Sequence, residues 1–107
     1  GKVQMKYHKK SQIVCLLRGK ITFMRILQTL EQLVASNAAV ALLFLEPAVH
    51  AVEGWDAEDQ NWREKLNRLP LTVYGDTPNC ALSDLITGVD RNQMAALIRN
   101  ADIVVPL

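Results

Sequence analysis

Short apolar runs alternate along this chain with longer segments in which apolar residues recur every three or four positions. The runs Gln12 to Leu17 and Ala39 to Leu45 are almost wholly apolar, as is typical of strands buried on both faces of a sheet. Between them, the segment Thr22 to Ser36 carries an apolar stripe of helical period. Asn37 is a plausible residue to end that helix. The first half of the chain therefore predicts a strand, a helix and a second strand.

The second half continues the alternation with shorter elements. We expect a turn of helix over Ala48 to Val52, a helix over Ala57 to Arg68, a strand over Leu71 to Tyr74, a loop over Gly75 to Asn79, a short helix through Ile86 and a strand over Thr87 to Val89. Asp90, with Gln93 three residues later, resembles a capping box that opens a further helix. Its predicted core face is Met94, Leu97, Ile98 and Ala101, and Ile103 to Val105 is the last predicted strand.

Strands joined by helices of this length pair in parallel, with right-handed crossovers. The sequence therefore predicts a single α/β domain over residues 12–107, with an open, mainly parallel sheet and helices on both faces. The strand Gln12 to Leu17 should lie near the centre of that sheet, because it is apolar throughout. Ligand sites in such sheets lie beyond the carboxyl ends of the strands. The expected rim of a binding site is Arg18, Lys20, Glu46, His50, Tyr74 and Asp76.

Composition narrows the class of protein further. Half of the 107 residues are apolar, which is enough for one core without metal or disulfide bonds. Only two cysteines are present, too few for a secreted disulfide framework. Cys15 falls inside an apolar run and is expected to be a buried thiol. A reducing, cytoplasmic location is the expectation that follows.

The net charge of +1 is unevenly distributed. Four lysines lie in the first ten residues, so the rest of the chain is net negative. Residues 1–11 form a basic arm, which we interpret as a solvated tail, its first four residues being a candidate remnant of cloning. Nucleic-acid binding is the alternative, but no interleaving of basic and aromatic residues follows the arm. No segment is apolar for the length of a membrane span. Neither nucleic acid nor membrane is expected as a partner.

Several chemistries lack their sequence signals. The five glycines form neither a phosphate-binding loop nor a dinucleotide fingerprint, so no cofactor is predicted. His8 and His50 stand alone, and the two cysteines are far apart, so no metal is predicted either. His50 fits a packed or rim histidine better than a base. Trp55 and Trp62 are interpreted as core residues or interface anchors, and their aromatic area favours self-association.

Cys80 is the candidate nucleophile. Thr77 or Asn79 could cap a short helix, and either choice places Cys80 in its first turn, where the helix dipole favours a thiolate. The residue also follows the third predicted strand, near the expected site. A small apolar residue packed in a short helix is the equally weighted alternative.

The order of segments resembles that of the DsrE/DsrF-like proteins. The apolar strand that runs into a turn and a short helix at residues 42–52 is similar to a corner of that family, and residues 88–104 are similar to its last helix and strand. Glu46-Pro47 stands where the family usually has glycine and aspartate. Sulfur-carrying members have a cysteine directly after the third strand, where this chain has Tyr74 or Gly75.

The resemblance implies a flavodoxin-like domain that associates into homo-oligomers or into hetero-oligomers with related subunits. It also implies intracellular sulfur metabolism. Cys80 would then be a persulfide carrier, acting as a sulfurtransferase-type relay between donor and acceptor proteins. The alternative is a non-catalytic oligomeric subunit, or a small-ligand-binding module of the same fold.

Overall fold

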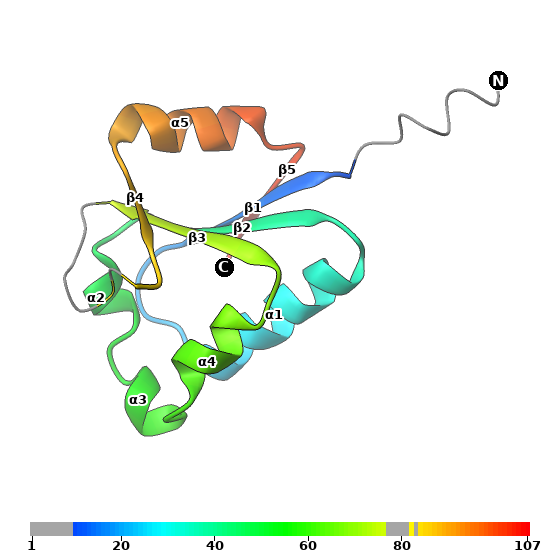
Figure 1. Cartoon of the computed structure of the whole chain (residues 1–107). Coiled ribbons are helices and arrows are strands. Elements are labelled where there is room, and N and C mark those ends of the chain that lie inside the picture. Colours follow the sequence, from blue (N-terminus) through cyan, green and yellow to red (C-terminus); the bar gives the residue numbers. More distant parts are fainter. Residues whose placement is uncertain (1–9, 77–81, 83) are drawn as a thin grey trace, which may run out of the picture.

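A five-stranded, all-parallel sheet organises the domain in the computed structural model (Figure 1). The structure describes residues 10–76, 82 and 84–107, and of Asp76 only the backbone. The strands are β1 (Gln12–Leu17), β2 (Ala39–Phe44), β3 (Leu71–Asp76), β4 (Thr87–Val89) and β5 (Ile103–Pro106), and their order is β4-β3-β2-β1-β5. The predicted α/β class and parallel pairing are confirmed. β1 lies between β2 and β5, inside the sheet as expected.

Helices cover both faces of the sheet, but unequally. The helices are α1 (Phe23–Ala35), α2 (Ala48–Ala51), α3 (Trp55–Glu58), α4 (Trp62–Asn67) and α5 (Arg91–Asn100). Figure 1 shows α1, α3 and α4 below the sheet and α5 alone above it. The chain moves in one direction from β1 to β4 and then returns to β5 beyond β1. Right-handed crossovers therefore place the returning helix, α5, on the opposite face.

The main core lies on the α1 face. Residues that alternate along β1, β2 and β3 point to this face and join the apolar stripe of α1, in a cluster that includes Cys15, Leu17, Leu42, Phe44 and Phe23. Trp55 and Trp62 complete this core and are only 1% and 2% exposed. Their ring centroids are 5.1 Å apart in an edge-to-face arrangement, and the Phe23 ring lies 5.3 Å from that of Trp55.

The two tryptophans are buried within the domain and do not lie at its surface. Both rings were expected either in the core or at an interface, and the structure confirms the core. Trp55 and Trp62 are therefore unavailable to a second copy of the chain, and basing self-association on them was wrong. Both rings are buried because α3 and α4 direct them inward, where they contact Phe23 of α1.

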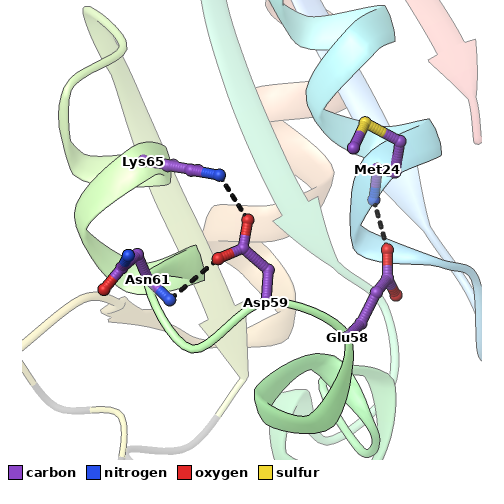
Figure 2. A network of polar contacts seen from close by, with 5 residues as sticks. All are labelled: Met24, Glu58, Asp59, Asn61 and Lys65. Carbon is purple, nitrogen blue, oxygen red and sulfur yellow. Dashed lines mark hydrogen bonds and ion pairs between the residues drawn. The ribbon is translucent and has the colours of Figure 1, made fainter.

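The predicted helix over Ala57 to Arg68 is wrong in its continuity, because the chain forms two helices there. Asp59 is extended, with φ −156° and ψ 108°, and ends α3. Its carboxylate accepts the backbone N–H of Asn61 at 2.9 Å and the ammonium of Lys65 at 2.5 Å (Figure 2). An aspartate that bonds to the backbone two residues on competes with helix formation. This turn starts α4 in a new direction.

Two further boundaries differ from the prediction. Gly75 and Asp76 continue β3 instead of starting a loop, because Gly75 pairs with Gly88 of β4. A Cβ at position 75 would lie 3.0 Å from the Ile86 side chain, so glycine allows this close approach. The capping box of α5 is confirmed, with Asp90 and Gln93 bonded reciprocally at 2.8 Å. The predicted core face of α5 is only half-buried, and no residue of α5 is fully buried.

Candidate functional site

The expected rim at the carboxyl ends of the strands consists of separate, exposed side chains. Arg18 follows β1 and is exposed, as are Glu46 after β2 and His50 in α2. No hydrogen bond or ion pair joins these three residues within the described part of the chain. Lys20 pairs instead with Glu53 at 3.2 Å, and both side chains are about two-thirds exposed (66% and 64%). Such an exposed pair contributes little to stability.

Two further residues expected at or near this rim are Asp76 and Cys80. Asp76 is the last residue of β3, so its backbone does lie at the carboxyl edge of the sheet. Cys80 and its two candidate caps, Thr77 and Asn79, lie outside the described residues.

The first turn of α1 already holds an anionic group from the protein itself. Oε1 of Glu58 accepts the backbone N–H of Phe23 at 2.9 Å. Its Oε2 accepts the backbone N–H of Met24 at 2.8 Å, as Figure 2 shows. The N-cap residue, Thr22, makes no side-chain capping bond. Helix N-termini attract anions because their backbone N–H groups are free. Here Glu58 satisfies two of those groups, which opposes the binding of an external phosphate at this corner.

Cys15 is unsuited to thiolate chemistry. Its side chain is fully buried within the core, between β2 and β5. Burial raises the pKa of the Cys15 thiol to about 11. The neutral thiol therefore dominates near neutral pH, and a neutral thiol is a poor nucleophile. The expectation of a buried thiol is confirmed.

A hollow with a volume of about 720 Å³ lies elsewhere, between α5 and the sheet. We call it the α5 groove. Its floor includes Ala39 and Ala41 of β2, flanked by Val14 of β1 and Thr72 of β3. Tyr74, two residues beyond Thr72, lies on the same face and also lines the groove. The groove exists because one helix spans this face and because the central strand presents alanines to it.

The polar groups of the α5 groove are uncharged. They come from Gln12, Thr72, Tyr74, Gln93 and Asn100, and no described lining residue is Asp, Glu, Lys, Arg or His. Gln93 uses Oε1 in the capping box of α5. The side chains of the other four make no hydrogen bond to another described residue. Four amide or hydroxyl side chains are thus available to a molecule in the groove.

Among the expected site residues whose side chains the structure describes, only Tyr74 lines the α5 groove. The strand pattern predicts a site at the carboxyl edge of the sheet, whereas the groove lies over the amino-terminal halves of β1 and β2, at residues 12–14 and 39–41. A usable signal was present in Ala39 and Ala41, small residues at alternate positions of a run otherwise made of bulky side chains. Small side chains on one face of a central strand leave a hollow wherever the helix that covers this face does not fill the space.

The described part of the chain contains neither a candidate membrane span nor a candidate metal site. No helix in it is long and apolar enough to cross a membrane. Among residues 10–76, 82 and 84–107, no three His, Cys, Asp or Glu side chains are grouped so that they could hold a metal ion.

Comparison of the chain with family models, with curated proteins and with solved structures found no match. The resemblance to DsrE/DsrF-like proteins therefore rests on the pattern of segments alone and stays a hypothesis.

Proposed function

We propose that this domain is a non-catalytic, small-ligand-binding module and that the α5 groove is its binding site. The observation that carries the proposal is the groove itself, with a volume of about 720 Å³, an apolar floor and four neutral polar side chains that make no hydrogen bond to another described residue. Ligand pockets are typically a few hundred to about 1,000 Å³, largely apolar, with a small number of polar groups that orient the ligand. The described residues at the carboxyl ends of the strands show no comparable convergence of side chains.

A screen of small molecules against the ¹⁵N-labelled full chain tests this proposal. Ligands should shift the backbone amide signals of Ala41, Thr72 and Asn100 together. Ala41→Leu places a larger side chain on the groove floor and should abolish the response. Ala57→Leu makes the same change at an exposed position of α3 and should preserve it. Ligands whose shifts map elsewhere, or bind Ala41→Leu unchanged, would contradict the proposal.

A second candidate is a persulfide carrier of the DsrE type, acting in the cytoplasm with Cys80 as the acceptor. Two observations favour it. Cys15 is excluded by burial, so Cys80 is the remaining thiol. Leu82, which lies between β3 and β4 in the chain, packs into the core on the α1 face. By contrast, α5, which follows β4, covers the other face (Figure 1). Connections that diverge from neighbouring strands create the crevice in which α/β proteins bind ligands.

The chain shares the parallel α/β architecture of flavodoxin-like proteins but not their strand order. Flavodoxin-like sheets have the strand order 2-1-3-4-5, whereas the order here is 4-3-2-1-5. In the proposed step, the Cys80 thiolate attacks the outer sulfur of a donor persulfide. A new S–S bond forms on Cys80, and the donor leaves as a thiolate, so no external oxidant is needed.

Mass spectrometry after incubation with a persulfide donor tests the carrier role. Added sulfur should appear on the unmodified chain and on Cys15→Ser, and be absent from Cys80→Ser. Labelling of Cys80→Ser equal to that of the unmodified protein would eliminate this candidate and leave the binding module.

A further inference from the structure

We infer that the α5 groove selects a compact, uncharged molecule that has an apolar body and both hydrogen-bond donors and acceptors. This inference rests on the proposed binding function of the groove and adds the chemical class of its ligand. The evidence is the combination of side chains that the sheet and α5 bring together.

The floor of the groove determines the apolar part of the ligand. Ala39 and Ala41 lie two residues apart on β2, and pairing places Val14 and Thr72 on either side of Ala41. Val14 is 5% exposed and Leu43, the next residue on this face of β2, is fully buried. A ligand that enters here therefore meets methyl groups below it, and its apolar surface gains free energy from leaving water.

The polar part of the ligand is determined by the lining groups that have no hydrogen-bond partner among residues 10–76, 82 and 84–107. Gln12 and Asn100 each offer an amide, which donates through its nitrogen and accepts through its oxygen. Thr72 and Tyr74 offer hydroxyls, which can do both. A ligand with only donors or only acceptors would leave part of this set unused. Amide, lactam, urea and similar neutral groups match it.

Charge selection follows from what the groove lacks. A charged ligand would lose hydration on entering, and no described lining side chain carries an opposite charge to compensate. The nearest acidic group in sequence to Asn100 is Asp102, and its Oδ2 already accepts the backbone N–H of Gln12 at 2.7 Å. Basic residues of α5, Arg91 and Arg99, are exposed and do not line the groove. The groove should therefore discriminate against ions of either sign.

Three probes of nearly equal size separate these cases, namely benzamide, benzoate and benzamidinium, which are neutral, anionic and cationic at neutral pH. They are titrated into the ¹⁵N-labelled full chain, and the shifts of Ala41, Thr72, Tyr74 and Asn100 are followed. Benzamide should bind with a dissociation constant on the order of millimolar, as expected for so small a ligand. Both ions should bind at least about tenfold more weakly, because each must be desolvated without a counter-charge.

Variants keep the test independent of folding failures. Thr72→Val retains the shape of the side chain and removes the hydroxyl, and Tyr74→Phe does the same for the aromatic ring. Each should weaken benzamide about fivefold, which corresponds to the loss of one neutral hydrogen bond. Thr29→Val, on α1 and away from the groove, is the matched control and should leave binding unchanged.

The outcomes separate the two levels of the proposal. If benzoate or benzamidinium binds as tightly as benzamide in the groove, the inferred ligand class is wrong while the binding function stands. If none of the three probes shifts the groove signals, the inference and the proposed function both fail. If the signals of Ala41 and Thr72, which lie on β2 and β3 away from the β5 edge, change on dilution of the protein alone, a second copy of the chain occupies the groove, which also overturns the inference.

Discussion

The carboxylate of Glu58 accepts the backbone N–H of Phe23 at 2.9 Å, across 35 residues of sequence. The same carboxylate accepts the N–H of Met24, so α3 supplies the cap that α1 lacks at Thr22 (Figure 2). The side chain of Trp55, also on α3, donates its indole N–H to the carbonyl of Ile21 at 2.9 Å. These bonds fix α3 against the start of α1 and carry the Trp55 ring into the core.

Removal of this cap should destabilise the domain. Glu58→Ala leaves two N–H groups of α1 without a protein acceptor, and we expect a loss of about 1 kcal/mol in the free energy of unfolding, as for other helix caps. Glu53→Ala, which removes only the exposed pair with Lys20, should change it by less than about 0.5 kcal/mol. Urea denaturation measures both. Equal effects of the two substitutions would contradict the capping role.

The buried aromatic cluster should be the most sensitive part of the core. Trp62 is 2% exposed, and its indole N–H donates to Asp56 at 2.6 Å. Trp62→Ala should cost about 3–5 kcal/mol, because it removes a large buried side chain and leaves a cavity. Trp62→Phe should cost less, since part of the ring volume remains. Denaturation followed by tryptophan fluorescence tests this order, and a cost below about 1 kcal/mol for Trp62→Ala would refute the packing argument.

Because Cys15 is buried, the free energy of unfolding should fall as the pH rises into the alkaline range. The raised pKa of about 11 means that the native state keeps the thiol neutral while the thiol of the unfolded chain ionises near its ordinary pKa of 9.0. The stabilising effect is complete below pH 9 and is lost as the pH rises from 9 to 11. Cys15→Ala should be less stable at neutral pH, from lost packing, but should lose less stability over that interval. Parallel pH dependences of the two proteins would contradict this prediction.

Because the pKa of Asp59 is lowered, the free energy of unfolding should fall as the pH becomes acidic. The hydrogen bond from Lys65, followed by that from the Asn61 backbone, lowers the pKa of the Asp59 carboxyl below its usual value. The stabilisation is therefore present above about pH 4 and is lost as the pH falls through the lowered native pKa. Asp59→Asn should lose less stability over that acid range than the unmodified protein. An unchanged acid limb in the variant would show that this carboxylate does not stabilise the turn.

Self-association remains a prediction, and β5 is now its basis. β5 lies at the edge of the sheet, and Ile103 and Val104 are 48% and 37% exposed. Asp102 directs its N–H inward to Gln12, so by alternation Ile103 directs its backbone groups to the free edge.

Light scattering at micromolar concentration should give a dimer, and Ile103→Lys should abolish it. Met24→Lys, at another exposed apolar position, is the control. A monomer mass for the unmodified chain would reject the prediction.

Features that depend on neighbours in sequence were determined by the sequence itself. The apolar runs of β1 and β2 need no more than their own composition to be recognised as buried parallel strands. The capping box of α5 joins residues three positions apart, so its pattern is visible in the chain. The parallel α/β class followed from the alternation of these elements.

Tertiary structure alone decided the features that join distant segments. The cap on α1 comes from a residue 35 positions away, and the indole of Trp55 bonds to the carbonyl of Ile21, 34 positions earlier. The α5 groove depends on which face of the sheet one helix crosses and on where Ala41 and Thr72 meet across two strands. Helical and strand periods describe single elements, whereas burial, capping between elements and cavities arise only when those elements pack against one another.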